Sequence, residues 1–312
     1  MFDYRRFFAV PLCVFALTAP ALSESLAAID TTHCVQTSIR IRPSNDRPIV
    51  EPAGLIRFTV ASPIRETAYL VQAWVPTGPA PVSGWPILYV LDGKAVFDLL
   101  AREFALDDLR TVIVGVSHDS AGVLDAPARA YDFTPPSPGA DRPVGLPRDP
   151  EGVNPHPGGG AEAFLDVLLN RIEPALVERL AQQPVAIDAA QRSIYGHSYA
   201  GLFVLYAYLK RPQDFIHSFA ASPSLWWNRQ ALMAELPGLE RLAGVGGTLS
   251  LTIGDIEAGC APYQSAAADF YRAMSRYIGR RASFEAFAGQ DHGAMLSVSL
   301  ARALTQWAVL PH

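Results

Sequence analysis

The segment Ile194-Tyr195-Gly196-His197-Ser198-Tyr199-Ala200-Gly201 joins an apolar run typical of a buried strand to an apolar run typical of a helix. In that context the pattern predicts a nucleophile elbow, a sharp turn that holds the hydroxyl of Ser198 above the edge of a sheet. Such a turn needs small residues two positions before and after the serine, so that strand and helix can approach each other. Gly196 meets this need, and Ala200 stands where glycine is usual. The alternative is that Ser198 only caps the following helix.

A serine hydroxyl becomes an effective nucleophile only beside a base. In the sequence order that accompanies this elbow, an acid and then a histidine follow the serine, each after a later strand. His292, within a Gly-Gln-Asp-His-Gly segment, has the expected position for the base. Two carboxylates, Asp255 and Glu257, follow the strand predicted at 248–253, and the spacing after Gly254 favours Glu257. The alternatives are that both carboxylates are solvated loop charges, or that the base works without an acid.

An oxyanion that forms during acyl transfer needs N–H donors to stabilise it. The backbone N–H of Tyr199, directly after the serine, is the first candidate. The second candidate is the N–H of Lys94, in the loop Leu91-Asp92-Gly93-Lys94 that follows a central strand. We expect Gly93 to adopt a backbone conformation that other residues avoid, and so to aim the Lys94 N–H at the site. The alternative is that Asp92-Gly93 forms an ordinary tight turn.

Around the elbow, strand-like and helix-like stretches alternate, which predicts an α/β protein with a mainly parallel sheet. The first stretches instead indicate an antiparallel meander. The expected strands are 37–41, 55–60, 68–75, 86–91, 111–116, 192–195, 216–221, 248–253 and 283–287. The expected helices are 96–109, 161–180, 202–209, 228–242, 261–279 and 294–307. Together these features predict an α/β-hydrolase fold, with a mainly parallel central sheet, an antiparallel N-terminal part and helices on both faces.

Composition restricts the classes of protein that the chain can form. Hydrophobic residues make up 50% of the 312 residues and charged residues 18%, which favours a packed core over disorder. The net charge of −5 gives no basic field for nucleic acid, and no cluster of His, Cys and carboxylates has metal-ligand spacing. We therefore expect no nucleic-acid partner and no metal or other cofactor. Residues 24–312 are predicted to form one domain, with a loop or lid rich in proline and glycine at about 134–160.

The first 23 residues have the pattern of a secretory signal peptide. Arg5 and Arg6 precede a short apolar stretch, which ends in small residues suited to cleavage. The arginines are either ordinary charges of such a signal or part of a twin-arginine signal. The mature protein is thus predicted to be periplasmic or secreted, and it lacks a second apolar run long enough for stable membrane insertion. Cys34 and Cys260 could pair in an oxidising compartment, a question that the sequence leaves open.

Several stretches of the chain carry a resemblance to a known family. They are 85–97, 129–135, 158–160, 196–203, 221–224 and 291–293. Of these, Leu-Asp-Gly at 91–93 and Arg-Ala-Tyr-Asp-Phe-Thr-Pro at 129–135 are the more diagnostic. With these motifs the chain resembles the esterase D-like α/β-hydrolases, and most closely the periplasmic siderophore esterases that cleave enterobactin and salmochelin trilactones. It departs from the family pattern at Ala200, and at the acid, because some members of the family look like Ser–His dyads.

The resemblance implies hydrolysis of carboxylic esters through an acyl-enzyme, with Ser198 as nucleophile and His292 as general base. It implies a small-molecule ester as substrate, for which a siderophore trilactone or its ferric complex is a candidate. Two other functions remain open. The same fold could transfer the acyl group to an alcohol, or it could serve a binding protein without catalysis.

The resemblance also implies two substrate contacts. Arg129 would hold an anionic or catecholate group, unless it forms a structural ion pair with Asp132 or a neighbour. Trp227, next to Trp226, would give a flat wall for aromatic groups, unless the pair serves packing.

Overall fold

The structure is a computed structural model of the 312-residue chain. It describes residues 54–104, 106, 109–136, 158–183, 185–227, 232–233, 236, 238–259 and 261–309. Several predictions lie outside the described residues: the signal peptide, the strand at 37–41, Cys34, Cys260 and most of the lid.

The described strands form one eight-stranded sheet in the order β1-β2-β4-β3-β5-β6-β7-β8. The strands are β1 (Leu55–Val60), β2 (Tyr69–Trp74), β3 (Trp85–Leu91), β4 (Val112–His118), β5 (Ile187–His197), β6 (His217–Ala221), β7 (Thr248–Gly254) and β8 (Ala282–Phe287). β2 pairs antiparallel with both β1 and β4. All other neighbouring strands pair in parallel. The predicted fold class, a mainly parallel sheet with an antiparallel N-terminal part, is therefore confirmed.

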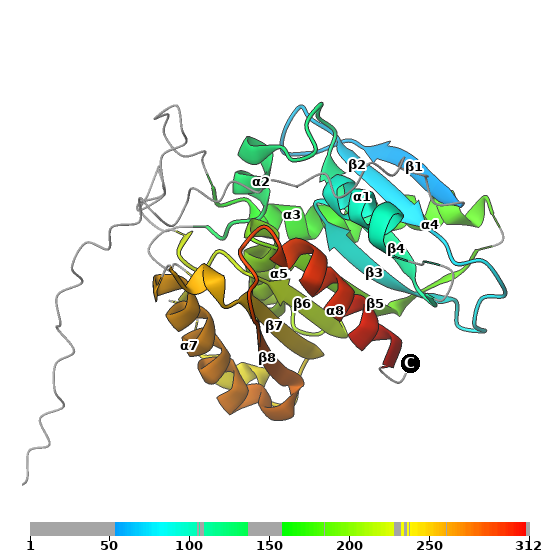
Figure 1. Ribbon diagram of the computed structural model, residues 1–312. Helices are drawn as coiled ribbons and strands as arrows, with labels where there is room; N and C mark the ends of the chain where they lie inside the picture. Colours follow the sequence, from blue (N-terminus) through cyan, green and yellow to red (C-terminus); the bar gives the residue numbers. More distant parts are fainter. Residues whose placement is uncertain are drawn as a thin grey trace, which may run out of the picture. The chain divides into compact units, whose positions relative to one another are not determined.

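Helices cover both faces of the sheet, with α1 and α8 in front of it in the view of Figure 1. The α-helices are α1 (Gly93–Glu103), α2 (Ala126–Asp132), α3 (Ala161–Val167), α4 (Glu173–Ala181), α5 (Tyr199–Lys210), α7 (Ala261–Ile278) and α8 (Met295–Val309). Leu88 and Val90 of β3 pack in one hydrophobic cluster with α1 and α8. Tyr89 and Leu91 pack in a second cluster with α5 and α7. Because both faces are covered, every residue of β3 is buried. Within the described residues, the structure has no helix that is both long and apolar enough to cross a membrane.

Several helices differ from the sequence predictions. Helix α1 begins and ends earlier than the predicted 96–109, and the short α2 was not predicted. The stretch predicted as one helix at 161–180 consists of α3, a π-helical turn at Leu168–Ile172, and α4. Pro174 lies in the first turn of α4, where its missing N–H removes one α-helical hydrogen bond at the junction. The predicted helix at 228–242 is only partly described, and a 3₁₀ turn occupies Leu239–Leu242.

The sheet brings distant parts of the sequence to one edge. β3 to β8 are parallel, so their carboxyl ends lie along the same edge. In open α/β sheets this edge is where ligands bind. The residues that directly follow the strands are Asp92, Asp119, Ser198, Ser222, Asp255 and Ala288. Most of the residues that the sequence singled out lie in these connections.

Candidate active site

Ser198 occupies a sharp turn between the end of β5 and the start of α5. Its backbone has φ 64° and ψ −122°, a conformation that an L-residue adopts at a cost of about 1–3 kcal/mol. The Ser198 N–H donates to the carbonyl of Ala221 at the end of β6, which holds the turn. A Cβ atom at Gly196 would come within 2.3 Å of the Ala200 carbonyl oxygen. Strand and helix therefore meet as an elbow requires, and the glycine two residues before Ser198 is what permits it.

A continuous chain of hydrogen bonds links Ser198, His292 and Glu257. The hydroxyl of Ser198 lies 3.0 Å from Nε2 of His292. On the other side of the ring, Nδ1 of His292 lies 2.9 Å from Oε2 of Glu257. Because a carboxylate only accepts hydrogen bonds, Nδ1 carries the proton and Nε2 is free to accept from the serine. This is the arrangement in which an imidazole can take the proton of an attacking hydroxyl.

Asp255, the other carboxylate after β7, does not join this chain. Its Oδ1 accepts a hydrogen bond of 2.7 Å from the N–H of Gly289. Glu257, in contrast, accepts from the hydroxyl of Ser222 at 2.6 Å and from the N–H of Gly254 at 2.9 Å, both through Oε1. Oε1 is thus held by Ser222 and Gly254, while Oε2 binds His292. The structure brings Glu257 to the histidine and directs Asp255 to the neighbouring loop.

The loops that carry the acid and the histidine are tied to each other. The Asp255 N–H donates to the Phe287 carbonyl at 3.0 Å, and the Ile256 N–H donates to the Gln290 carbonyl at 3.2 Å. Asp291 accepts from the N–H of Ala294 at 2.8 Å, just before α8 begins. The first two bonds fix the turn after β7 and the turn after β8 relative to each other, so Glu257 and His292 are positioned together.

The ring of His197 packs against the ring of His292. It is 2% exposed, and its ring centroid lies 4.7 Å from that of His292. Burial lowers the pKa of His197 well below its ordinary value, and its closeness to His292, which becomes charged during catalysis, and to the charge of Arg129 lowers it further. His197 is therefore a neutral ring that packs against His292.

The two predicted oxyanion donors differ in their surroundings. Tyr199 is the first residue of α5, where backbone N–H groups have no acceptor within the helix. The N–H of Lys94 instead donates to the hydroxyl of Ser117 at 2.8 Å. The expectation that Gly93 supplies an unusual backbone conformation is wrong, since the residue with positive φ is Asp92, at 56°. Gly93 is needed for a different reason: a Cβ there would lie 2.6 Å from the backbone of Gly115.

Arg129 forms a buried ion pair with Asp92. Its Nε and one terminal nitrogen donate to the two carboxylate oxygens of Asp92, at 2.6 and 2.8 Å. Arg129 is 6% exposed, and its guanidinium carbon lies 5.8 Å from the centre of the Tyr199 ring. Asp132, which the sequence offered as its partner, accepts instead from Tyr69 at 2.9 Å and from Arg65. The geometry favours the structural alternative for Arg129, with Asp92 as the neighbour.

Trp227 is 2% exposed and belongs to the hydrophobic core. The partly buried Trp226 is the one of the pair that lies beside the site, with its ring 5.8 Å from the ring of Tyr199. Burial of this extent favours packing as the role of Trp227. A wall for an aromatic ligand would come from Trp226 and Tyr199.

Some residues at the site were not given a role from the sequence. Ser222 binds Glu257, and the hydroxyl of Ser224 lies 3.4 Å from that of Ser198. The available signal was position: both follow β6, the parallel neighbour of β5, and so must lie near the elbow. Among the described residues no group of three or more His, Cys, Asp or Glu side chains could hold a metal ion.

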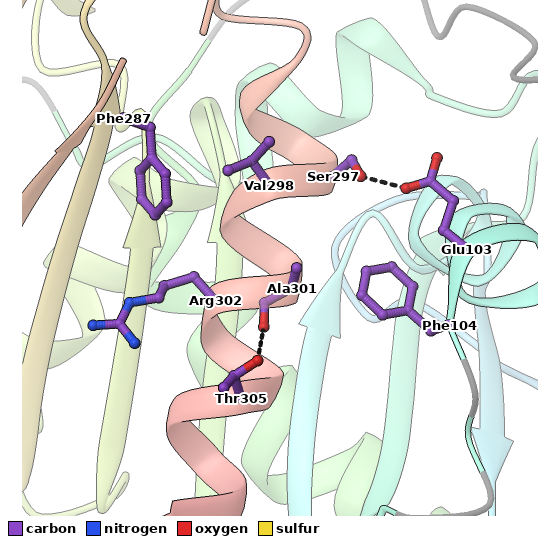
Figure 2. Close-up of a pocket in the computed structure, with 8 residues that line it drawn as sticks. All are labelled: Glu103, Phe104, Phe287, Ser297, Val298, Ala301, Arg302 and Thr305. Atoms are coloured by element: carbon purple, nitrogen blue, oxygen red, sulfur yellow. Dashed lines mark hydrogen bonds between the residues drawn. The ribbon is translucent and has the colours of Figure 1, made fainter. Parts of the chain in front are cut away.

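A groove of about 480 Å³ crosses α8, and none of its lining residues belongs to the Ser198–His292–Glu257 chain. Figure 2 shows its lining, including the hydrogen bond from Ser297 to Glu103 and the side chains of Phe104 and Phe287.

The sheet, the elbow at Ser198 and the Ser–His–Glu chain together define an α/β-hydrolase. A family model described as "Putative esterase" matches residues 65–243, more than half of the chain. The chain belongs to this Esterase family.

The chain is also similar to curated proteins and to solved structures. A siderophore triacetylfusarinine C esterase of Aspergillus fumigatus is 35% identical over 205 residues, which cover 61% of this chain and 63% of that protein. The ferri-bacillibactin esterase BesA of Bacillus subtilis is 27% identical over 286 residues, 86% of this chain and 94% of that protein. The structure of the enterobactin hydrolase IroE in complex with DFP superposes with a TM-score of 0.62 at 28% identity, over 82% of this chain and 95% of that chain.

Proposed function

We propose that this protein is a serine esterase that hydrolyses a carboxylic ester of a siderophore through an acyl-enzyme. The observation that supports this most directly is the unbroken hydrogen-bond chain from Ser198 through His292 to Glu257. The named relatives are esterases of siderophores, which supports the substrate class. A siderophore trilactone, free or as its iron complex, is a substrate of the proposed kind.

In the proposed first step, the hydroxyl oxygen of Ser198 attacks the ester carbonyl while Nε2 of His292 takes the hydroxyl proton. The resulting imidazolium is stabilised by Glu257, which accepts a hydrogen bond from Nδ1. The tetrahedral intermediate then collapses, and His292 returns the proton to the leaving alkoxide. An alcohol departs and the acyl group stays on Ser198.

In the second step, His292 accepts a proton from water, and the hydroxide so formed attacks the acyl-enzyme. As this second intermediate collapses, the bond to Ser198 breaks and His292 returns its proton to the serine oxygen, which releases the carboxylic acid and restores the Ser198 hydroxyl. Each bond made to the acyl carbon is balanced by one broken, and no cofactor is required.

The oxyanion of both intermediates would rest on backbone N–H groups, each worth about 10²–10³ in kcat. We propose Tyr199 as one donor. Lys94 is the other donor inferred from the sequence, and it would have to exchange its hydrogen bond with Ser117 for one with the substrate. The Gly93 N–H, one residue earlier in the first turn of α1, is a further candidate donor.

Labelling with a fluorophosphonate probe tests the proposal directly. The proposed esterase forms a covalent adduct at Ser198 and releases acid and alcohol from a simple aryl ester. A protein that only binds would give neither result. An acyltransferase would be labelled, but in the presence of an alcohol it would form a new ester in place of the free acid.

We also propose that residues 1–23 are removed on export and that 24–312 act as one domain outside the cytoplasm. The charge and hydropathy pattern of the first residues supports this proposal.

A further inference from the structure

The connections at the carboxyl edge of the sheet have an unusual balance of charge. β1 and β2 are antiparallel and β2 is antiparallel to β4, so the β1–β2 connection lies at this same edge. We call the whole set the catalytic edge: residues 61–68, 92–94, 119–136, 222–227, 255–259 and 288–294. Ser198, which follows β5, lies at the same edge as these connections.

The catalytic edge carries many more acids than bases. Its eight carboxylates are Glu66, Asp92, Asp119, Asp125, Asp132, Asp255, Glu257 and Asp291. Its three cations are Arg65, Lys94 and Arg129. With histidine neutral, this edge alone has as much net negative charge as the whole chain, whose net charge is −5.

Each of the three cations is already bound by the protein. Arg129 forms the bidentate pair with Asp92, and Arg65 binds Asp132. The ammonium group of Lys94 donates to the carbonyl of Ser120 at 2.8 Å and to that of Gly122. These protein partners reduce the attraction that each of the three groups has for an anionic ligand.

Glu66, Asp119 and Asp255, in contrast, are exposed at this edge. These carboxylates would repel a negatively charged ligand that approaches this edge.

The stretches of sequence between the described parts do not reverse this balance. Residues 137–157 contain three carboxylates, at 141, 149 and 151, and two arginines, at 142 and 148. Residues 228–237 contain one arginine and one glutamate. Their composition therefore adds no net positive charge.

Apolar side chains are exposed on the same connections. Ile64, Val123 and Ile256 are 37%, 41% and 58% exposed. They belong to the β1–β2 connection, the β4–α2 connection and the turn after β7, respectively. Exposed apolar side chains on these connections add no charge to the edge.

We propose that the active site selects esters without net negative charge and rejects polyanionic ones. Iron(III) bound by three hydroxamates is neutral, whereas iron(III) bound by three catecholates carries three negative charges. The preferred siderophore ester is thus a neutral one, either metal-free or in a hydroxamate-type iron complex. This inference rests on the proposed esterase function and specifies its substrate.

Three 4-nitrophenyl esters of equal acyl chain length test the proposal, with the chain ending in a methyl, a carboxylate or a trimethylammonium group. Each kcat/KM is divided by the rate constant for hydroxide hydrolysis of the same ester, which removes differences in intrinsic reactivity. At low ionic strength we expect the anionic ester to be about tenfold or more poorer than the neutral one, and the gap to shrink when salt screens the edge. An anionic ester that equals or exceeds the neutral one at low salt would overturn the selectivity. Failure to hydrolyse all three esters would instead refute the esterase function on which the selectivity rests.

A pair of matched variants assigns the effect to the catalytic edge. Glu66→Lys with Asp119→Lys reverses two exposed charges at this edge, and neither residue belongs to the catalytic chain. Glu178→Lys with Glu240→Lys makes the same change in net charge at exposed positions that precede β5 and β7, near the opposite edge. We expect only the first pair to raise kcat/KM for the anionic ester, by about tenfold, with the neutral ester changed less than about twofold. Equal gains from both pairs would show that overall charge, and not the catalytic edge, controls selection.

Discussion

The imidazole of His197 lies against the imidazole of His292, with ring centroids 4.7 Å apart and ring planes tilted by 41°. His292 is hydrogen-bonded to Ser198. His197 is buried, and its Nε2 atom has no hydrogen-bond partner among the described residues. A second charge beside His292 would oppose the imidazolium that catalysis needs. The buried position of His197 prevents that charge from forming.

The burial of His197 predicts a specific dependence of stability on pH. In the unfolded chain this histidine takes up a proton near pH 6.5, about its ordinary pKa, whereas in the folded protein its lowered pKa keeps it neutral. Below about pH 6.5 the unfolded state therefore binds more protons than the folded state. As the pH decreases through this range, His197 lowers the free energy of unfolding by up to about 1.4 kcal/mol per pH unit. His197→Phe should remove that contribution. Urea unfolding of both proteins at pH 5 and pH 8 measures it, and an equal loss of stability in both would show that His197 becomes charged in the folded state.

Ser198→Ala and His292→Ala should each lower kcat on a neutral aryl ester by about 10³ or more, because either change breaks the path of the proton. The double variant should be little worse than either single variant, since the two side chains act as one unit. Steady-state kinetics, with circular dichroism to confirm folding, gives the answer. Losses that multiply in the double variant would place the chemistry on other residues.

Variants of Glu257 and Asp255 test which of these two carboxylates acts on His292. Glu257→Gln should keep KM and lower kcat by up to roughly 10⁴, because the amide can no longer hold the imidazolium. Asp255→Asn is the matched control: it bonds Gly289 and not His292, so kcat should change less than about tenfold. Losses of about tenfold or less in both variants would indicate a Ser–His pair that works without its acid.

Arg129 should act on stability more than on binding. Arg129→Met leaves Asp92 buried without its partner, which should lower the free energy of unfolding by about 3–5 kcal/mol. Arg129→Lys keeps the charge but loses the two-point contact and should destabilise less. KM for a neutral ester should stay unchanged in the lysine variant. A large rise in KM with unchanged stability would mean that Arg129 contacts the substrate.

Export predicts a shortened N-terminus. Protein recovered from the periplasm or medium of the native organism should begin near Glu24, because the small residues before it suit signal cleavage. Intact-mass measurement settles the point. Full-length protein confined to the cytoplasm would contradict it.

Sequence patterns were sufficient for the parts of the fold that depend on local composition. β3 and β4 are continuous apolar runs buried on both faces, and such runs are recognisable without any knowledge of their neighbours. Helix α2 was missed because seven residues are too few to show a helical period, although Asp125 caps it and Pro127 lies in its first turn.

The sequence motifs and their order were sufficient to predict which residues form the site, but not the contacts that hold them. Position after a strand places Ser198, Glu257 and His292 at one edge, and the spacing after Gly254 favours Glu257 over Asp255, but the hydrogen bonds that hold Glu257 in place come only from the fold. The pair of Arg129 and Asp92 joins residues 37 positions apart, and only the tertiary fold, in which α2 packs against α3 and α5, brings them into contact. The positive φ at Asp92 was assigned to Gly93 because sequence reasoning assumes that glycine takes the unusual conformation.

The bonds between the turn after β7 and the turn after β8 have a consequence for hydrogen exchange. The N–H groups of Asp255, Ile256 and Gly289 all bridge these two turns. Neither turn can open without breaking bonds to the other, so these amides should exchange at similar rates and respond alike to denaturant. Local opening would then remove the acid and the base from Ser198 in a single event, and the population of half-assembled sites would be negligible.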